Sequence, residues 1–307
     1  YGALEDTSIF VNFTMDNSNI PSDYINGVVI DQDGNKWLVD PNNLTRFDDQ
    51  NWVIYNSENS AYPGGNANSI AAFGNEIWIA TSSGLVIYKN GGFEIIDSRS
   101  GLPSDYVYCG LKVDDNTMWV GTNLGLCYFN GTGWIVYNTD NSGLPMNNVS
   151  SIKIDAFNNK WIGTLGGGVA KFDDTNWIVY DSENSGLPAS NKVTDIEIID
   201  GISIWVSFNS MGKTALGGTA VYDGTGWTSF PSAPSSDVSG AAVQNQNLVW
   251  FGNFDYGLSK YENGSWHTFL ISNSHISSNR VFGISIDRNN NKWIATYGGG
   301  LSKYKGN

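Results

Sequence analysis

An internal repeat is the feature that most constrains this chain. A short segment ending in Trp and small residues occurs seven times, and the successive Trp are 41 to 45 residues apart. The seven segments are centred on Trp37, Trp78, Trp119, Trp161, Trp205, Trp250 and Trp293. Periods of 20 to 50 residues are typical of chains built from similar small units, each of which packs against its neighbours.

Each repeat predicts four short strands. The Trp strand is followed by a Gly-rich turn and a GLxxY-like strand, then by a WxxY-like strand, a polar loop that often reads NSGLP, and an alternating strand such as residues 149–155. No segment has the period of a long amphipathic helix. Four strands at this period are typical of a propeller blade. The sequence therefore predicts an all-β fold, a seven-bladed β-propeller of four-stranded blades, rather than a solenoid with atypical capping repeats.

The two ends of the chain predict how the last blade is completed. The seventh repeat ends at its third strand, residues 300–305, and lacks the WxxY strand. Residues 10–14 precede an NSNIP loop and have the spacing to Trp37 that a fourth strand has to the next Trp. We expect residues 10–14 to close the last blade in a 3+1 arrangement, because an unpaired strand edge invites association. Residues 1–8 are then an N-terminal tail, and residues 9–307 a single propeller domain.

Composition excludes several function classes. The 307 residues include 16 basic and 30 acidic side chains, a formal net charge of −14. This balance disfavours nucleic acid and anionic membrane as partners, since both reward clustered Lys and Arg. No apolar run approaches the roughly 20 residues of a membrane span, so we predict no membrane insertion in this chain.

Cysteine and histidine are too few for a metal or disulfide framework. The chain has two Cys and two His, and neither a zinc site nor any cofactor is predicted. Cys109 and Cys127 fall on the first and third strands of one blade. Two strand spacings are roughly 9–10 Å, beyond disulfide reach, so both are predicted to be free, buried thiols.

The twelve Trp are predicted to be structural. Seven lie in the second strands and five in the fourth strands of the repeats, which accounts for all of them. Residues placed by the repeat are most simply explained by blade-to-blade packing, where each buries on the order of 200 Å². Eight other aromatic residues have no place in the repeat: Tyr24, Tyr62, Tyr106, Tyr108, Phe254, Tyr256, Phe282 and Tyr297.

These unassigned rings fall in two kinds of connection that emerge on the same rim of an up-and-down blade. One leads from a fourth strand to the next first strand, and the other is the turn after the Trp strand. The rings either cover the blade ends or form a binding face. The residue just before the first strand also varies between repeats: Tyr24, Tyr106, Asn148, Lys192, Asp237 and Arg280. Loops carry function more often than the scaffold does.

The rim combines flat rings, a forked Arg donor and an Asp acceptor. That combination suits a sugar or another polar small molecule, whose hydroxyls both donate and accept hydrogen bonds. We predict a shallow site at the channel mouth, centred on blades five to seven and one. An insertion at residues 209–218 either covers part of the mouth or is a tolerated surface insertion. The predicted ligand-binding residues are Tyr24, Tyr106, Lys192, Asp237, Phe254, Asp255, Tyr256, Arg280 and Tyr297.

Other motifs predict no chemistry. DQDGN at residues 31–35 resembles the start of a calcium loop, but the equivalent residues 155–159 and 287–291 lack the second carboxylate. These segments are predicted to be strand-joining turns. His267 and His275 have no clustered metal ligands around them in the sequence, and no G-x-S-x-G elbow is present. We predict no catalytic residues.

The repeats resemble a known family. Residues 101–131 and 147–188 carry the pattern W-[IV]-G-T, G-[LV] and NSGLP, and look like two-component regulator propeller repeats; the resemblance covers about residues 9–307. Blades five, six and one depart from it, for example at Ser207-Phe208 and Asp40-Pro41.

The resemblance implies an extracytoplasmic location in bacteria, periplasmic or secreted. In that family the propellers form sensor parts of hybrid histidine kinases or parts of secreted surface proteins, and the implied ligands are often oligosaccharides. The immunoglobulin-like domain, membrane helix and kinase core that usually accompany them are expected on a larger chain or as partners, unless this is a short stand-alone member.

Three functions are compatible with the sequence. The first is a non-catalytic ligand-binding or sensor propeller for an oligosaccharide or another polar small molecule. The second is a protein–protein interaction scaffold of a secreted or surface protein, because acidic, Asn-rich rims suit docking. The third is a polysaccharide lyase or hydrolase, in which Tyr or His would act with Arg280 or Lys192. We expect the first, and therefore no enzyme.

Overall fold

Seven four-stranded sheets make up the structure, a computed structural model that describes residues 9–210, 216–231 and 233–306. Each sheet takes its strands in chain order, except the last, which β1 completes. A short 3-10 turn occurs at Ser98–Ser100, and no α-helix occurs within the described residues. The predicted all-β, seven-bladed β-propeller is confirmed. Blades are numbered here by their Trp strands, from Trp37 in blade 1 to Trp293 in blade 7.

The strand bounds follow the predicted repeat in every blade. Blade 1 holds β2 (Gly27–Ile30), β3 (Lys36–Val39), β4 (Leu44–Phe47) and β5 (Trp52–Tyr55), and blade 2 holds β6 (Ala67–Phe73), β7 (Glu76–Thr81), β8 (Gly84–Lys89) and β9 (Gly92–Ile96). Blade 3 holds β10 (Val107–Lys112), β11 (Met118–Thr122), β12 (Gly125–Phe129) and β13 (Trp134–Tyr137), and blade 4 holds β14 (Val149–Ile154), β15 (Lys160–Thr164), β16 (Val169–Phe172) and β17 (Trp177–Tyr180). Blade 5 holds β18 (Val193–Ile199), β19 (Ser203–Phe208), β20 (Gly218–Tyr222) and β21 (Trp227–Pro231), and blade 6 holds β22 (Val238–Asn245), β23 (Leu248–Asn253), β24 (Leu258–Glu262) and β25 (Ser265–Phe269). Blade 7 holds β26 (Val281–Ile286), β27 (Lys292–Thr296), β28 (Leu301–Tyr304) and β1 (Phe10–Phe13).

The chain divides into two compact units. Unit 1 contains the described residues of 1–78, 87–94 and 240–307, and unit 2 contains those of 79–86 and 95–239. Unit 1 therefore holds blades 1, 6 and 7 with much of blade 2, and unit 2 holds blades 3 to 5. Each unit is described by itself below. That residues 9–307 form one domain remains a prediction, and the predicted tail, residues 1–8, lies outside the described residues.

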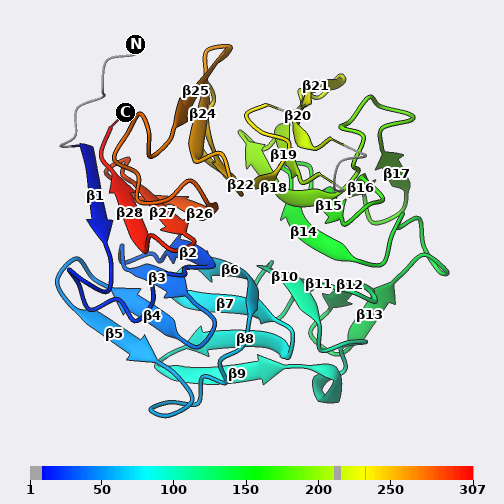
Figure 1. The fold of residues 1–307 in the computed structure, drawn as a ribbon. Coiled ribbons are helices and arrows are strands. Elements are labelled where there is room, and N and C mark those ends of the chain that lie inside the picture. The colour runs from blue at the N-terminus through cyan, green and yellow to red at the C-terminus, as the bar shows by residue number, and fades with distance from the viewer. Residues whose placement is uncertain (1–8, 211–215, 232, 307) are drawn as a thin grey trace. The chain divides into compact units, whose positions relative to one another are not determined.

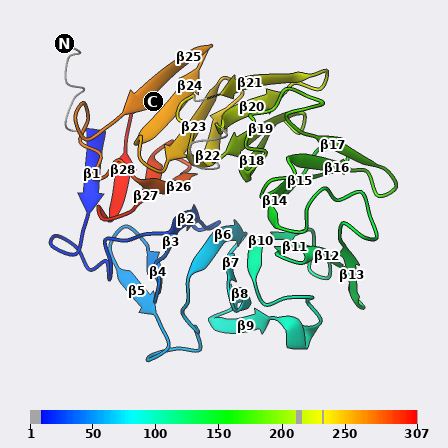
Figure 2. The same cartoon turned by 45° about the vertical axis from the view of Figure 1, so that its right-hand side comes forward.

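The last blade is completed as predicted. β1 pairs antiparallel with β28, with Phe10 opposite Tyr304 and Phe13 opposite Leu301. Figures 1 and 2 show β1, in dark blue, beside the red strand β28. The Phe13 ring stacks on Trp293 of the same blade, with 5.9 Å between centroids, and lies 5.4 Å from Phe47 of blade 1. The N-terminal strand thus joins the last blade to the first.

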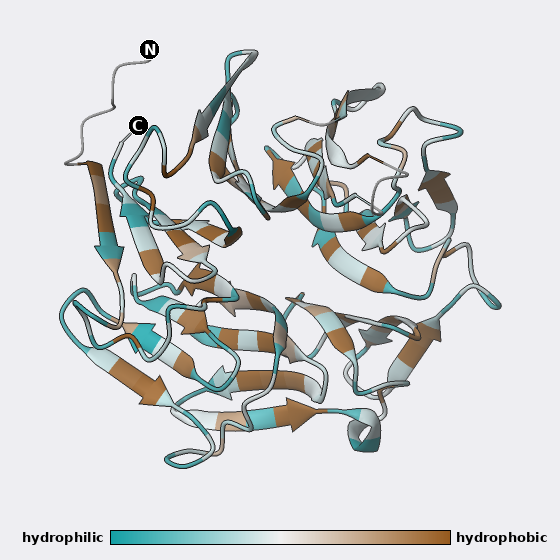
Figure 3. Ribbon diagram, in the orientation of Figure 1, coloured by the Kyte–Doolittle hydropathy of each residue, from teal (hydrophilic) through white to brown (hydrophobic). Residues whose placement is uncertain are grey.

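Buried Trp side chains hold neighbouring blades together. All seven second-strand Trp are buried, and each of the five fourth-strand Trp is partly buried. Trp293 of blade 7 lies in one core cluster with Val28, Leu38 and Phe47 of blade 1. Trp119 of blade 3 likewise packs with residues of blade 4. Figure 3 shows that the strands carry brown, hydrophobic bands while the loops are mostly teal or white. The predicted packing role of the Trp is confirmed.

Three buried Lys add charge to these blade contacts. Each directly precedes its Trp in the sequence, and its Nζ lies over the Trp ring of the preceding blade. The distances to the ring centroids are 4.6 Å for Lys36 over Trp293, 5.8 Å for Lys160 over Trp119 and 4.7 Å for Lys292 over Trp250. A cation over a desolvated indole face is stabilising, so the KW dipeptide of the repeat is a packing device.

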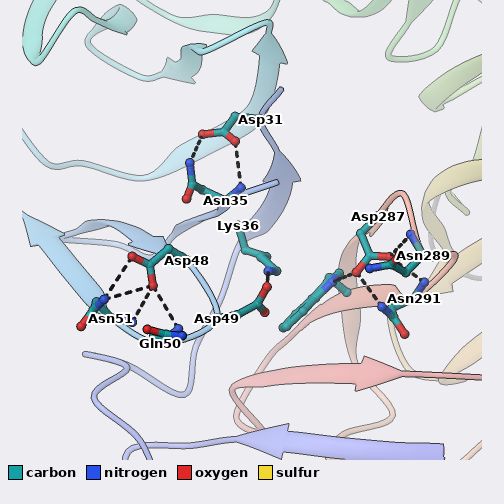
Figure 4. A network of polar contacts seen from close by, with 11 residues as sticks. Asp31, Asn35, Lys36, Asp48, Asp49, Gln50, Asn51, Asp287, Asn289 and Asn291 are labelled. Carbon is teal, nitrogen blue, oxygen red and sulfur yellow. Dashed lines mark hydrogen bonds and ion pairs between the residues drawn. The ribbon is translucent and has the colours of Figure 1, made fainter. Parts of the chain in front are cut away.

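The turn at residues 31–35 is structural, as predicted. Asp31 accepts hydrogen bonds from the backbone N–H groups of Asp33 and Asn35, from the Asn35 amide and from the Trp37 indole, all at 2.8 to 3.0 Å. Figure 4 shows Asp31 with Asn35 and the equivalent turn at Asp287 with Asn289 and Asn291. Both oxygens of Asp31 are therefore occupied by hydrogen bonds from the turn and from Trp37, which gives this carboxylate a structural role. Within the described residues there is no cluster of three potential metal ligands.

The Gly of the W-x-G-T pattern permits close approach between blades. A Cβ built at Gly121 would lie 2.5 Å from Cys109 Sγ and 2.6 Å from the backbone oxygen of Val149, the first residue of the next blade's inner strand. A Cβ at Gly163 would lie 2.4 Å from Cγ1 of Val193, the first residue of the blade after that. The following Thr closes the turn, since its hydroxyl donates to the carbonyl three or four residues later, at 2.8 to 3.0 Å in blades 2, 3, 4 and 7.

The apolar residue of the NSGLP loop is a core anchor. Leu102, Leu144 and Leu187 are all at most 4% exposed. Tyr62 has the corresponding place in the loop before β6, and it is fully buried with its ring 5.7 Å from Phe93. Of the two alternatives for Tyr62, a ring that packs into the blade is therefore correct and a ring on a binding face is wrong. The repeat does assign it a place, and it differs from the three Leu by carrying a hydroxyl.

The two cysteines are free and buried, as predicted. Cys109 lies on β10 and Cys127 on β12, with β11 between them. Burial raises the pKa of each thiol to about 12.

Two further features bear on the site. Of the predicted insertion at residues 209–218, residues 211–215 lie outside the described part of the chain. In the part of the chain that the structure describes, no helix is long and apolar enough to cross a membrane.

Candidate functional site

The varying residues before each first strand have one shared backbone role. In blades 3, 4, 5 and 7 the carbonyl of this residue accepts a hydrogen bond from the N–H of the residue that follows the Trp strand. The donors are Asn123 to Tyr106, Leu165 to Asn148, Asn209 to Lys192 and Tyr297 to Arg280, at 2.9 to 3.2 Å. The backbone is therefore constant at this position while the side chain is free to differ, as expected of a recognition surface on a fixed scaffold.

A β-bulge follows two residues later. The pairing between first and second strands shifts between Val281 and Gly283 in blade 7, so Phe282 is the bulged residue. The same shift occurs around Tyr108 in blade 3. Bulges often re-aim a side chain near functional sites. Here the bulge brings the ring of Phe282 to the same cluster as Tyr297, the residue that bonds the Arg280 carbonyl.

Six side chains of unit 1 form one contiguous group, which we name the rim cluster: Tyr24, Phe254, Asp255, Arg280, Phe282 and Tyr297. Successive ring centroids lie 4.7 Å apart for Tyr24 and Tyr297, 5.3 Å for Tyr297 and Phe282, and 5.4 Å for Phe282 and Phe254. Tyr24 and Tyr297 also form a backbone bridge. Loops of blades 6, 7 and 1, together with Phe282 at the start of β26, thus build a continuous aromatic row.

Arg280 is held at the centre of this row. Its Nε lies 3.0 Å from Asp255 Oδ1 and donates to the Phe254 carbonyl at 3.4 Å. Its guanidinium carbon lies 4.9 Å from the centre of the Tyr297 ring. No hydrogen bond to the two Arg280 Nη atoms is found within the described residues. The ion pair and the ring orient the guanidinium and leave its outer N–H donors without a partner among the described residues.

Several of these side chains are accessible. Tyr24 is 49% exposed, Tyr297 40%, and the Arg280 side chain 48%. Tyr256, in the same turn as Phe254 and Asp255, is 51% exposed and makes no ring contact within the described chain. Because Arg280 covers one face of Tyr297, the rings with the most open faces are Tyr256 and Tyr24. Together they offer stacking surface beside fixed N–H donors.

The structure therefore brings together five of the nine predicted residues, with Tyr256 in an adjoining position. The remaining three, Tyr106, Lys192 and Asp237, belong to unit 2. Tyr106 is 39% exposed and its ring lies 5.0 Å from Tyr108. Burial, and then the neighbouring Tyr106, raise the pKa of Tyr108.

Lys192 and Asp237 differ in whether their side chains already have hydrogen-bond partners. The Lys192 side chain has no hydrogen-bond or ion-pair partner among the described residues. Asp237 accepts hydrogen bonds from the Ser210 N–H at 3.0 Å, the Ser210 hydroxyl at 2.6 Å and the Ser236 hydroxyl at 3.2 Å. Its carboxylate therefore orders the adjoining loops, and it is a weaker candidate for ligand contact than Lys192.

Phe282 is the cluster residue that the predicted site lacks. Its ring bridges Phe254 and Tyr297. A sequence signal does exist, since Phe282 is one of the rings that the repeat does not place, two residues after the varying position. The bulge that turns it toward Tyr297 is not visible in the sequence.

The cluster contains no acid–base pair with an obvious catalytic geometry. His267 and His275 are both exposed, and neither is among the contacts of the rim cluster. His275 accepts a hydrogen bond from the Asn12 amide through its backbone carbonyl.

Comparison with known proteins identifies the fold. No protein-family model matches this sequence. No curated protein matches it either. Among solved structures, an extracellular domain assigned to a hybrid two-component system of B. thetaiotaomicron has a TM-score of 0.77 at 20% identity, and covers 96% of this chain and 41% of its own. The extracellular domain assigned to a one-component system of the same organism also has a TM-score of 0.77, at 18% identity, over 98% of this chain and 40% of its own.

A third similar structure belongs to an enzyme. Virginiamycin B lyase from Staphylococcus aureus has a TM-score of 0.72 at 13% identity, and covers 96% of this chain and 97% of its own. Identities this low show the shared fold alone. The fold agrees with the resemblance to two-component regulator propeller repeats, and this chain spans about two-fifths of the length of the two extracellular domains.

Proposed function

We propose that this protein is a non-catalytic ligand-binding propeller of the sensor type, with its site at the rim cluster. The observation that carries the proposal is the fixed Arg280, whose outer N–H groups lie unused beside half-exposed tyrosines. A sugar or another hydroxyl-rich molecule would stack on Tyr256 or Tyr24 and accept hydrogen bonds from Arg280, while Asp255 would accept from its hydroxyls. Rings with a few placed polar groups are typical of small-molecule sites.

Two comparisons support a sensor role outside the cytoplasm, periplasmic or secreted. The similar structures include extracellular domains assigned to two-component and one-component systems. Tyr106 and Lys192 occupy the same backbone position as Arg280 in other blades, so they are proposed as further ligand contacts. Asp237 is also proposed as a ligand contact, through the carboxylate lone pairs that do not accept hydrogen bonds from Ser210 and Ser236.

Binding should be tested with a thermal-shift screen of oligosaccharides, followed by calorimetry on three variants. A ligand at a hundredfold excess over its Kd stabilises the fold by about 2.7 kcal/mol. Tyr256→Ala, Arg280→Gln and Asp255→Asn should each weaken binding by about 1–3 kcal/mol while the melting temperature stays near that of the parent. If all three bind like the parent, the site is elsewhere.

Trp161→Ala is the matched control for this set. Its ring is 1% exposed and packs between blades, so we expect a loss of about 3–5 kcal/mol of stability. Its effect on ligand affinity should be small at temperatures where the variant is folded.

The enzymatic alternative is favoured by the lyase among the similar structures. The same screen separates the two, because an enzyme converts the stabilising oligosaccharide to product and a sensor does not. A protein-binding scaffold would give no shift with any oligosaccharide.

A further inference from the structure

A second hollow lies at the opposite end of the blades of unit 1, between blades 1 and 2. It encloses about 380 Å³, within the range of small-molecule sites. It is lined by the β2–β3, β6–β7 and β8–β9 turns and by Arg46 on β4. The rim cluster lies where β2 begins and β27 ends, so the two sites use different ends of the strands.

The carboxylates around this hollow already accept hydrogen bonds or form ion pairs. Asp31 accepts four hydrogen bonds within its own turn. Asp33 Oδ2 accepts from the Asn75 amide at 2.9 Å, a contact that joins the two blades. Glu76 pairs with Lys89 at 2.5 Å. These acids therefore shape the hollow, and Asp33 Oδ1 is the carboxylate oxygen that remains to accept a hydrogen bond.

Arg46 differs from the cations at the same place in other blades. It lies across from Trp37, as Lys171, Lys260 and Lys303 lie across from their own Trp. Those three lysines sit over their Trp rings at 4.6 to 5.8 Å. The rings around Trp37 are not what differs, because Tyr88 and Tyr55 lie 4.9 and 6.0 Å from it, much as Tyr222 and Tyr180 lie 5.4 and 5.9 Å from Trp161, where Lys171 is over the indole. The difference is that Arg46 makes no such contact with Trp37 in the described chain.

The Arg46 charge has no partner in direct contact within the described residues; it acts on Asp48 and Tyr55 only through space, where it favours their ionised forms. Within the described residues its guanidinium has no hydrogen bond, ion pair or ring contact, although it lines the hollow. The Asn90 side chain in the β8–β9 turn is likewise without a hydrogen-bond partner in the described chain, and it lines the same hollow. A planar guanidinium with free N–H groups matches a carboxylate in a two-point contact.

We propose that this hollow binds a small hydroxylated carboxylate. The carboxylate pairs with Arg46, and hydroxyl groups donate to Asp33 Oδ1 and bond to the Asn90 amide. Three acids against two bases leave the lining with one net negative charge, so a bare anion is disfavoured and hydroxyl donors are required. This site does not depend on the rim cluster or on the proposed function.

Calorimetry on the full chain tests the proposal with a matched pair of probes. D-glucuronate and D-glucose share a ring and differ in the carboxylate, and sodium sulfate is the bare anion. Saturable binding of glucuronate is expected, with glucose and sulfate at least about tenfold weaker. Arg46→Gln should weaken glucuronate binding by about 10- to 100-fold, as for loss of a charged hydrogen bond.

Two control variants make the result specific. Arg288→Gln removes the same charge nearby, but Arg288 already donates to the Gln32 carbonyl, so binding should persist. Arg280→Gln alters the rim cluster and should also leave glucuronate binding unchanged. No saturable glucuronate binding, equal binding of glucose or sulfate, or parental affinity in a folded Arg46→Gln would each overturn the proposal. Loss of binding only in Arg280→Gln would assign the probe to the rim cluster and overturn it as well.

Discussion

At the scale of single residues, the buried lysines show how the repeat tolerates charge in its core. Lys292 is fully buried, donates to the Gly306 carbonyl at 2.6 Å and lies over Trp250. Burial, and then the charge of Lys260, lower the pKa of Lys292 from 10.5 to about 8. Lys153 shows the opposite outcome: burial lowers its pKa, but Glu197 and Asp195 together raise it more, so the net pKa is raised.

Lys292 predicts a stability that depends on pH. Its pKa is lower in the folded than in the unfolded chain, so between pH 8 and pH 10.5 the unfolded state binds more protons, and stability rises with pH. The contribution should grow by about 2 kcal/mol from pH 7 to pH 9.5. Urea unfolding at both pH values should show the stability of the parent relative to Lys292→Met rising by about 2 kcal/mol from pH 7 to pH 9.5. The difference is the readout because the buried Cys109 and Cys127, with pKa values of about 12, lower the stability of both chains above pH 9. Lys153→Met should show the same pH dependence as the parent, and a departure from it would contradict the assignment to Lys292.

Tyr62 carries a hydroxyl that the fold does not use. The oxygen is buried without a hydrogen-bond partner, and burial, then the nearby Asp40, raise the pKa of Tyr62. An unpaired buried hydroxyl costs about 1–3 kcal/mol, so Tyr62→Phe should increase the free energy of unfolding by about 1 kcal/mol. Tyr55→Phe is the control, because its hydroxyl lies 3.2 Å from that of Tyr88, and it should lower stability or leave it unchanged. Chemical denaturation of both variants measures these changes in the free energy of unfolding.

At the scale of the elements, the close approach of one blade's Trp strand to the next blade's first strand sets what the repeat tolerates. Gly121→Ala places a methyl group against the Val149 backbone, which cannot rotate away. We expect a loss of about 1–3 kcal/mol from overpacking. Gly133→Ala, where nothing lies within 4 Å of the added Cβ, should change stability little. Equal midpoints of thermal unfolding for the two variants would show that the blades can separate at no cost.

At the scale of the whole molecule, β1 decides whether blade 7 has its outer strand. Deleting residues 1–14 removes the pairing with β28 and the Phe13 contacts to Trp293 and Phe47. The exposed edge and lost burial should lower the melting temperature by many degrees. A deletion of residues 1–8 retains β1 and isolates its contribution. An unchanged melting temperature in the longer deletion would contradict the 3+1 closure.

The sequence by itself determined the architecture of this protein. Seven Trp at nearly equal spacing predicted the blades, the missing fourth strand of the last repeat predicted β1, and repeat position predicted which Trp are packing residues. These features can be recognised in the sequence because each blade packs the same face against its neighbour. The same residue types must therefore recur at the same period.

Tertiary structure decided the sites. Tyr24 and Tyr297 are far apart in the sequence and become neighbours only because β1 joins blade 7 to blade 1, and Phe282 reaches them through a bulge that residue types do not encode. Arg46 looks like the other cations opposite a Trp until the structure shows that, unlike Lys171, Lys260 and Lys303, it does not lie over the indole. The repeat determines the residues that all blades share. A binding site is made of the residues that differ between blades, and only the tertiary structure shows which of those residues lie next to one another.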